Sequence, residues 1–154
     1  EGVGELTLLM PTIARMTQAG RLVALIAPPF CPYAPAWQRA GVDLRYLEIV
    51  DTNAQAASKG ALWAFEQCLR SAAFSAVLGW PSNADGPALR RLQVAADTGE
   101  CLGFAGRGSK HPDNPPPRPL RIERVENDWR IRKCRGGQIP SQGFAPPLHA
   151  GLPG

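Results

Sequence analysis

The stretch that decides the fold is Gly2-Val3-Gly4-Glu5-Leu6-Thr7, which leads into a helix-like run at 8–19 and the apolar run Leu22-Val23-Ala24-Leu25-Ile26-Ala27. A Gly-rich turn followed by a helix and a strand is the framework of a phosphate-binding loop, in which Lys and then Ser or Thr follow the last Gly. Here Glu5 and Leu6 occupy those two positions. A carboxylate repels phosphate and a Leu cannot hold Mg²⁺. The stretch therefore indicates an NTPase-like framework that has lost its chemistry.

Two further positions of the framework have also lost the expected residues. An NTPase has a catalytic Glu just after the second strand and a metal-holding carboxylate at the tip of a later one. This chain has Pro28-Pro29 and Trp80-Pro81 there. We therefore expect no catalytic residue, no metal and no cofactor. The alternative is a chance match in an unrelated α/β protein.

Hydrophobic periodicity predicts alternating strands and helices. Leu6, Leu9 and Ile13 begin an apolar stripe at helical spacing, in which Pro11 should introduce a kink. The predicted helices cover 8–19, 36–40, 54–71 and 86–98, and the predicted strands cover 22–27, 47–50, 75–80 and 101–105. This alternation is typical of an α/β fold with a mostly parallel sheet flanked by helices.

The C-terminal third has a different composition. We divide the chain into an α/β core at 1–107, a Pro-rich linker at 108–119, a basic β-hairpin at 120–137 and a flexible tail at 138–154. A two-residue turn at Asn127-Asp128 would place Leu120 and Ile122 on the same face as Trp129 and Ile131. The opposite face would carry charged side chains: Arg121, Glu123, Arg130 and Arg132.

Positive charge is concentrated in the hairpin. Residues 118–135 contain seven Lys or Arg and three acidic residues, an excess of +4 that equals the formal net charge of the whole chain. Such a concentration favours binding to DNA phosphates or to an acidic protein. The alternative is an ordinary solvated strand face.

For several notable residues we weigh a purely structural role against a functional one. We expect Trp63 and Phe65 to belong to the core, and Trp80 either to pack or to dock a partner. The four cysteines lie more than thirty residues apart, which favours buried free thiols over a zinc site or disulfides. No catalytic role is expected for the two histidines, His111 and His149. The chain has no signal peptide and no apolar run of about 18 residues, so we expect a cytoplasmic protein without a membrane span.

Several segments resemble the SulA/ImuA family, whose members are catalytically inactive relatives of the RecA core. The resemblance covers roughly residues 1–137. It rests on these stretches: Gly4-Glu5-Leu6-Thr7-Leu8-Leu9, Leu25-Ile26-Ala27-Pro28-Pro29, Pro32-Tyr33-Ala34-Pro35, Ala40-Gly41-Val42-Asp43-Leu44, Leu62-Trp63-Ala64-Phe65-Glu66-Gln67-Cys68-Leu69-Arg70-Ser71, Ala76-Val77-Leu78-Gly79-Trp80, Leu89-Arg90-Arg91-Leu92-Gln93 and Leu102-Gly103-Phe104.

The resemblance implies a truncated RecA-like fold and a non-enzymatic function. ImuA-type members act with ImuB and a C-family DNA polymerase in damage-induced translesion synthesis, whereas SulA-type members block cell division by binding FtsZ. The Pro-Tyr-Ala-Pro segment and the basic hairpin favour the ImuA type, with RecA or DNA as further partners. A third alternative is an active RecA-type ATPase with its phosphate loop upstream of residue 1, because a RecA-like core should have a strand before Gly2. A homodimer is also compatible with the family.

Under the leading interpretation two surfaces bind partners, the Pro-rich loop and the hairpin. The residues expected to make contact are Phe30, Tyr33, Trp37, Arg121, Arg124, Arg130, Arg132, Lys133 and Arg135. The residues of the degenerate nucleotide site are Gly2, Gly4, Glu5, Leu6, Pro28, Pro29 and Trp80.

Overall fold

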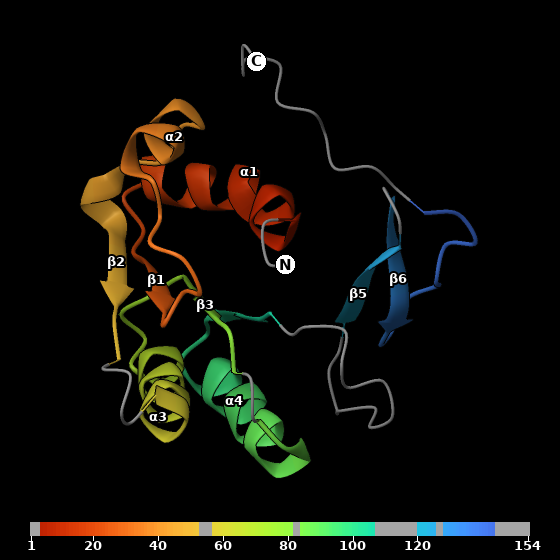
Figure 1. Cartoon of the computed structure of the whole chain (residues 1–154). Helices are drawn as coiled ribbons and strands as arrows, with labels where there is room; N and C mark the ends of the chain where they lie inside the picture. Colours follow the sequence, from red (N-terminus) through yellow and green to blue (C-terminus); the bar gives the residue numbers. More distant parts are fainter. Residues whose placement is uncertain (1–3, 53–56, 82–83, 107–119, 126–127, 144–154) are drawn as a thin grey trace.

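The computed structural model describes residues 4–52, 57–81, 84–106, 120–125 and 128–143, which form a parallel sheet between helices and a separate hairpin (Figure 1). This confirms the predicted α/β class. The elements are α1 (Gly4–Gln18), β1 (Val23–Ile26), α2 (Ala34–Arg39), the 3-10 turn η1 (Leu44–Tyr46), β2 (Leu47–Val50), α3 (Ala57–Arg70), β3 (Ala76–Gly79), α4 (Gly86–Thr98), β4 (Leu102–Ala105), β5 (Leu120–Val125) and β6 (Asp128–Cys134).

The four strands of the sheet are all parallel, in the order β2-β1-β3-β4. The two central strands, β1 and β3, are buried at every residue. Helices cover both faces of the sheet, so neither central strand alternates between apolar and polar residues. The edge strands β2 and β4 are partly exposed.

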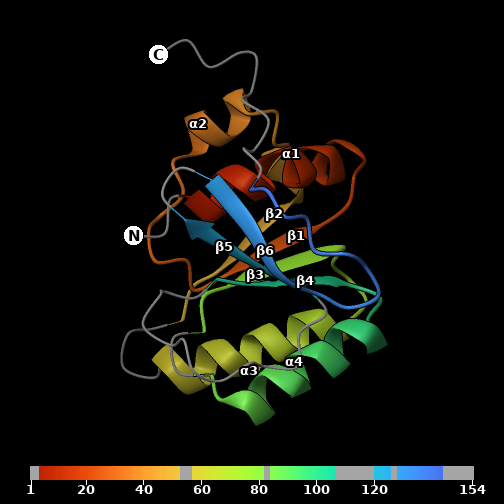
Figure 2. The same cartoon turned by 90° about the vertical axis from the view of Figure 1, so that its right-hand side faces the viewer.

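α1 and α2 cover one face of the sheet, and α3 and α4 cover the other (Figure 2). Val23 and Leu25 of β1 belong to the core on the side of α1 and α2, and Ala24 and Ile26 belong to the core on the side of α3 and α4. This division follows from the two-residue period of a strand.

The start of α1 lies toward the carboxyl edge of the sheet. Gly20, with φ +72°, ends the turn after α1, as expected for a glycine helix stop, and β1 begins three residues later. Because this connection is short, α1 runs back over the sheet, antiparallel to β1 (Figure 2). The helix continues as one element through Pro11, where we expected a kink.

The hairpin lies beyond β4, on the side of the sheet opposite β2 (Figure 1). Val125 pairs with Asp128 and Ile122 pairs with Ile131. The predicted turn at Asn127-Asp128 is therefore wrong by one residue, because Asp128 is already part of β6. The connection still has two residues, so the predicted sharing of a face by Ile122, Trp129 and Ile131 is confirmed.

Two core predictions are corrected by the structure. Phe65 is 2% exposed, but Trp63 on the same helix is 65% exposed and lies outside the core. The cysteines are all free, yet Cys31 is exposed, not buried as predicted. The linker at 108–119, Gly2, Asn127, both histidines and the tail from residue 144 lie outside the described residues.

Candidate protein-binding surfaces

The predicted nucleotide-site residues lie at the start of α1 and at the ends of β1 and β3. Gly4 and Glu5 begin α1, Pro28 and Pro29 follow β1, and Trp80 follows β3, whereas Gly2 lies outside the described residues. Leu6 and Trp80 pack against the same core cluster, which also contains Leu25 and Leu78. Leu6 and Trp80 therefore contribute apolar side chains to the core on this side of the sheet.

Trp80 is closely packed and carries an unsatisfied donor. Its indole N–H is buried and meets no hydrogen-bond acceptor in the described part of the chain. A Cβ atom at Gly106 would lie 2.7 Å from the indole nitrogen, so only a glycine fits there. Trp80 is thus a packing residue whose polar atom is directed toward the end of β4, the simpler of the two predicted alternatives.

The Pro-rich loop after β1 exposes two aromatic rings. Phe30 is 63% exposed and Tyr33 is 66% exposed. Tyr33 is also the residue that precedes α2, so the helix fixes one end of the loop. Exposed aromatic side chains on a rigid support are typical contact residues of protein interfaces.

Trp37 was expected to contact a partner, and the structure corrects this. Its side chain is 5% exposed and packs in the core with Ile13 and Val42. The N–H of Val42 donates to the Trp37 carbonyl at 3.0 Å, which closes the turn after α2. Trp37 therefore anchors α2, and the neighbouring loop keeps only Phe30 and Tyr33 as large exposed apolar residues.

The predicted cations of the hairpin are distributed over both strands. Arg132 and Glu123 form an ion pair across the two strands, with Arg132 Nε 2.6 Å from Glu123 Oε2. Arg124, Arg130 and Arg135 are exposed. Arg121 is half-buried and lies directly opposite Lys133 across a bulge in the ladder. Both residues of this pair are cationic, one on each strand of the hairpin.

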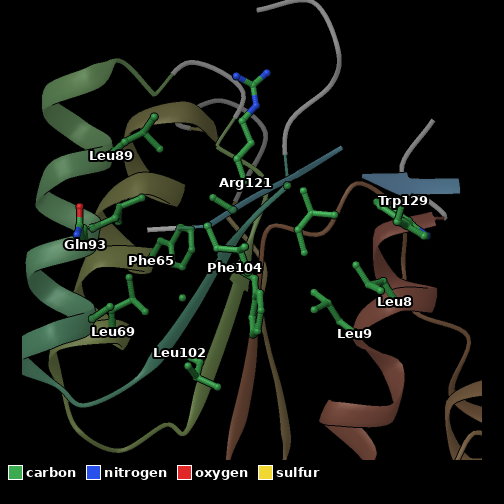
Figure 3. A pocket seen from close by; sticks show the side chains of 17 residues that line it. Leu8, Leu9, Phe65, Leu69, Leu89, Gln93, Leu102, Phe104, Arg121 and Trp129 are labelled. Carbon is green, nitrogen blue, oxygen red and sulfur yellow. The ribbon is translucent and has the colours of Figure 1, made fainter. Parts of the chain in front are cut away.

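A cavity of about 390 Å³ lies between β4 and the hairpin (Figure 3). Its lining is almost wholly apolar and comes from all layers of the fold: Leu8, Leu9, Phe65, Leu69, Leu89, Leu92, Gln93, Ala96, Leu102, Gly103, Phe104, Ala105, Gly106, Leu120, Arg121, Ile122 and Trp129. Sequence reasoning missed this cavity because no local pattern records how the hairpin lies against the core. A volume of this size is within the range of ligand pockets.

The shifted pKa values have structural causes. A side-chain hydrogen bond from Arg45 lowers the pKa of Asp43 and raises that of Arg45. Burial raises the pKa of the Cys68 thiol, and burial with the neighbouring Cys68 raises the pKa of Cys101 to about 11. The first pair orders the turn before η1, and the two thiols lie in and beside the α3–α4 layer.

Two general comparisons found no similar protein: no family model matches the chain, and no curated protein matches it. Among solved structures, the chain is similar to SulA from Pseudomonas aeruginosa, with 26% sequence identity and a TM-score of 0.57. The match covers 70% of this chain and 92% of the SulA chain. The fold is thus SulA-like. Separately, no helix in the described ranges combines the length and apolarity needed to cross a bilayer.

Proposed function

We propose that this chain is a non-enzymatic, cytoplasmic protein of the SOS response that inhibits cell division by binding FtsZ, as SulA-type proteins do. The observation that carries the proposal is the likeness to SulA, which extends over 92% of that chain at 26% identity. The exposed Phe30 and Tyr33 supply contact residues of the kind that protein interfaces use. The apolar packing of Leu6 and Trp80 is consistent with a role that needs no nucleotide.

The test is an FtsZ sedimentation assay with GTP. Adding the purified chain at increasing molar ratio should lower the amount of FtsZ that pellets. The double variant Phe30→Ala, Tyr33→Ala should lose this effect, because truncating central aromatic contacts costs binding energy of about 2 kcal/mol or more. Trp63→Ala is the matched control, since it removes an equally exposed aromatic ring on α3.

Two outcomes contradict this proposal. Unchanged FtsZ pelleting at a molar excess of the chain would exclude inhibition. Equal loss of inhibition in the double variant and in Trp63→Ala would move the contact surface away from the Pro-rich loop.

The hairpin supports a second candidate, an ImuA-like adaptor that binds ImuB and a C-family error-prone polymerase, with RecA or DNA as further ligands. The supporting observation is the excess of Arg and Lys on β5 and β6. Binding through these cations should weaken steeply as salt rises. The variant Arg124→Glu, Arg130→Glu should reduce capture of ImuB or of single-stranded DNA, whereas Arg39→Glu on α2 should not. Capture that is insensitive to the double reversal would leave the hairpin with a structural role.

A further inference from the structure

Two strand edges line the cavity between the core and the hairpin. From β4 and the residue after it, five consecutive residues contribute, Leu102 to Gly106, and from β5 three consecutive residues contribute, Leu120 to Ile122. Side chains alternate along a strand, so one face would supply only every second residue. Consecutive lining residues therefore mean that the cavity meets both strands edge-on.

Among the described residues, the edge of β4 that faces away from β3 has backbone groups without a ladder partner. The N–H of Leu102 donates to Ser75 at 3.0 Å, and that of Gly106 donates to Gly79 at 2.9 Å. Residues of a parallel ladder alternate in direction, so Gly103 and Ala105 direct their N–H and C=O groups away from β3. Both residues have small side chains, which permits close approach by another strand. Within the described residues, β4 has no second neighbour, and β5 pairs only with β6.

The two sides of this slot are apolar. Leu8, Leu9 and Phe104 lie on the α1 side, while Leu89 lies on the α4 side, as Figure 3 shows. Leu92 belongs to the same core cluster as Leu89. A strand placed between β4 and β5 would bury side chains in both directions. A strand covered on both faces is typically a short run of apolar, β-branched residues.

The charges at the slot select a negatively charged occupant. Arg121 is the charged residue of the lining, and no Asp or Glu of the described residues contributes to it. An occupant with carboxylates beside its apolar run is complementary to this arrangement.

We propose that the slot between β4 and β5 binds an extended segment of a partner protein, an apolar β-branched run flanked by acidic residues, which adds a strand and joins the two sheets. Main-chain hydrogen bonds from Gly103 and Ala105 supply affinity, and the acidic flank meets Arg121. Such strand addition is a recurrent mode of peptide recognition. This inference does not depend on FtsZ being the target.

The probe is the blocked peptide Glu-Glu-Val-Ile-Val-Glu-Glu, added to the full chain and followed by amide hydrogen exchange in NMR. The expected result is exchange at least about tenfold slower for the Gly103 and Ala105 amides at saturation, with little change at Leu102 and Phe104, which already bond to β3. Two control peptides are matched in length. Lys in place of all four Glu tests charge, and Pro in place of the central Ile tests strand pairing.

Variants of the protein give the second arm. Arg121→Glu should weaken binding of the acidic peptide about tenfold or more and strengthen binding of the Lys peptide. Arg39→Glu, an equal charge change on α2, should change neither affinity. Ala105→Pro removes an outward N–H on an edge strand and should abolish peptide protection. Circular dichroism checks that each variant is folded. If Ala105→Pro is unfolded, the comparison of Arg121→Glu with Arg39→Glu still tests the site.

Several results would overturn the proposal. Absence of protection at millimolar peptide excludes the site, and equal protection by the Pro peptide excludes strand addition. Gly103 and Ala105 amides that are already slow in the dilute free protein would mean that the chain closes this edge itself. Protection that grows with protein concentration would mean that a second copy fills it. If Arg121→Glu and Arg39→Glu changed peptide binding equally, Arg121 would not recognise the acidic flank.

Discussion

At the residue scale, Gly99 has a role beyond ending α4. Gly99 is the C-cap residue and follows Thr98, the last residue of the helix. The same residue is also buried against the backbone of α3, where a Cβ atom would collide with the carbonyl oxygen of Leu69. Backbone atoms cannot turn aside as a flexible side chain can, so the two helices would have to separate.

We therefore expect Gly99→Ala to destabilise the protein by about 3 kcal/mol or more, at or above the upper end of ordinary overpacking. The measurement is urea unfolding followed by circular dichroism. Gly86→Ala is the matched control, because a Cβ atom there meets nothing within 4 Å. Alanine in the first turn of α4 should leave stability unchanged or raise it slightly. Equal stability of the two variants would show that α3 and α4 pack less closely than described.

Cys101 offers a second test at this scale. Burial, with a contribution from the neighbouring Cys68, raises the pKa of its thiol from 9.0 to about 11. Since the thiolate is the nucleophile, the folded protein should react with iodoacetamide at Cys101 about a hundredfold more slowly than the urea-unfolded protein at pH 8. Peptide mass spectrometry would measure both rates. Similar rates in the two states would contradict the burial of Cys101.

The same shift gives a pH dependence of stability. The folded pKa lies above the unfolded one, so between pH 9 and about 11 the unfolded state binds fewer protons than the folded state. The contribution of Cys101 to the free energy of unfolding is therefore fully present below pH 9 and is lost as pH rises through that window. The variant Cys101→Ala should show a smaller loss over the same window. An identical decline in both proteins would assign the loss to other groups.

At the scale of elements, α3 shows what the sequence could predict. Ala61, Leu62, Phe65 and Leu69 follow the helical period, and the structure packs all four in or against one core cluster. Trp63 lies two positions from Phe65, which is about 200° around a helix and therefore on the other side. Its size suggested burial, but its position in the period decides its exposure.

This helix supplies a matched pair of substitutions. Phe65→Ala should cost about 3 to 5 kcal/mol, because the ring is 2% exposed and lies against Gly79 of β3. Trp63→Ala should cost less than about 1 kcal/mol, because 65% of that residue is already in water. Thermal unfolding measures both. A large loss for Trp63→Ala would mean that another surface covers this ring.

Prediction from sequence was good where the signal is local. The predicted bounds of β2 and α4 match the structure, because the spacing of apolar residues is a signal within each segment. The burial of Trp37 and the cavity beside β4 depend on packing between distant segments. Of the expected site residues, Phe30 and Tyr33 proved exposed because prolines and the start of α2 hold the loop outside the core.

At the scale of the whole molecule, the carboxyl edge of the sheet is where a parallel α/β protein usually binds its ligand. Three elements meet there: α1 begins with Gly4-Glu5-Leu6, β1 is followed by prolines, and β3 is followed by Trp80. Leu6 and Trp80 share one apolar cluster. We therefore expect that a lysine in place of Glu5 would not create a nucleotide site, because Pro28, Pro29 and Trp80 supply neither a metal ligand nor a base.

We therefore expect that 5 mM ATP with Mg²⁺ leaves the melting temperature of the full chain unchanged. A protein that bound the nucleotide with a dissociation constant a hundredfold lower than its concentration would gain about 2.7 kcal/mol. For a chain of this length that gain corresponds to a rise of roughly 5 to 10 °C. Repeating the melt with EDTA separates a nucleotide effect from an effect of ionic strength, because only the former needs the metal. A magnesium-dependent rise of several degrees would show that the backbone at the start of α1 still holds phosphate, despite Glu5 and Leu6.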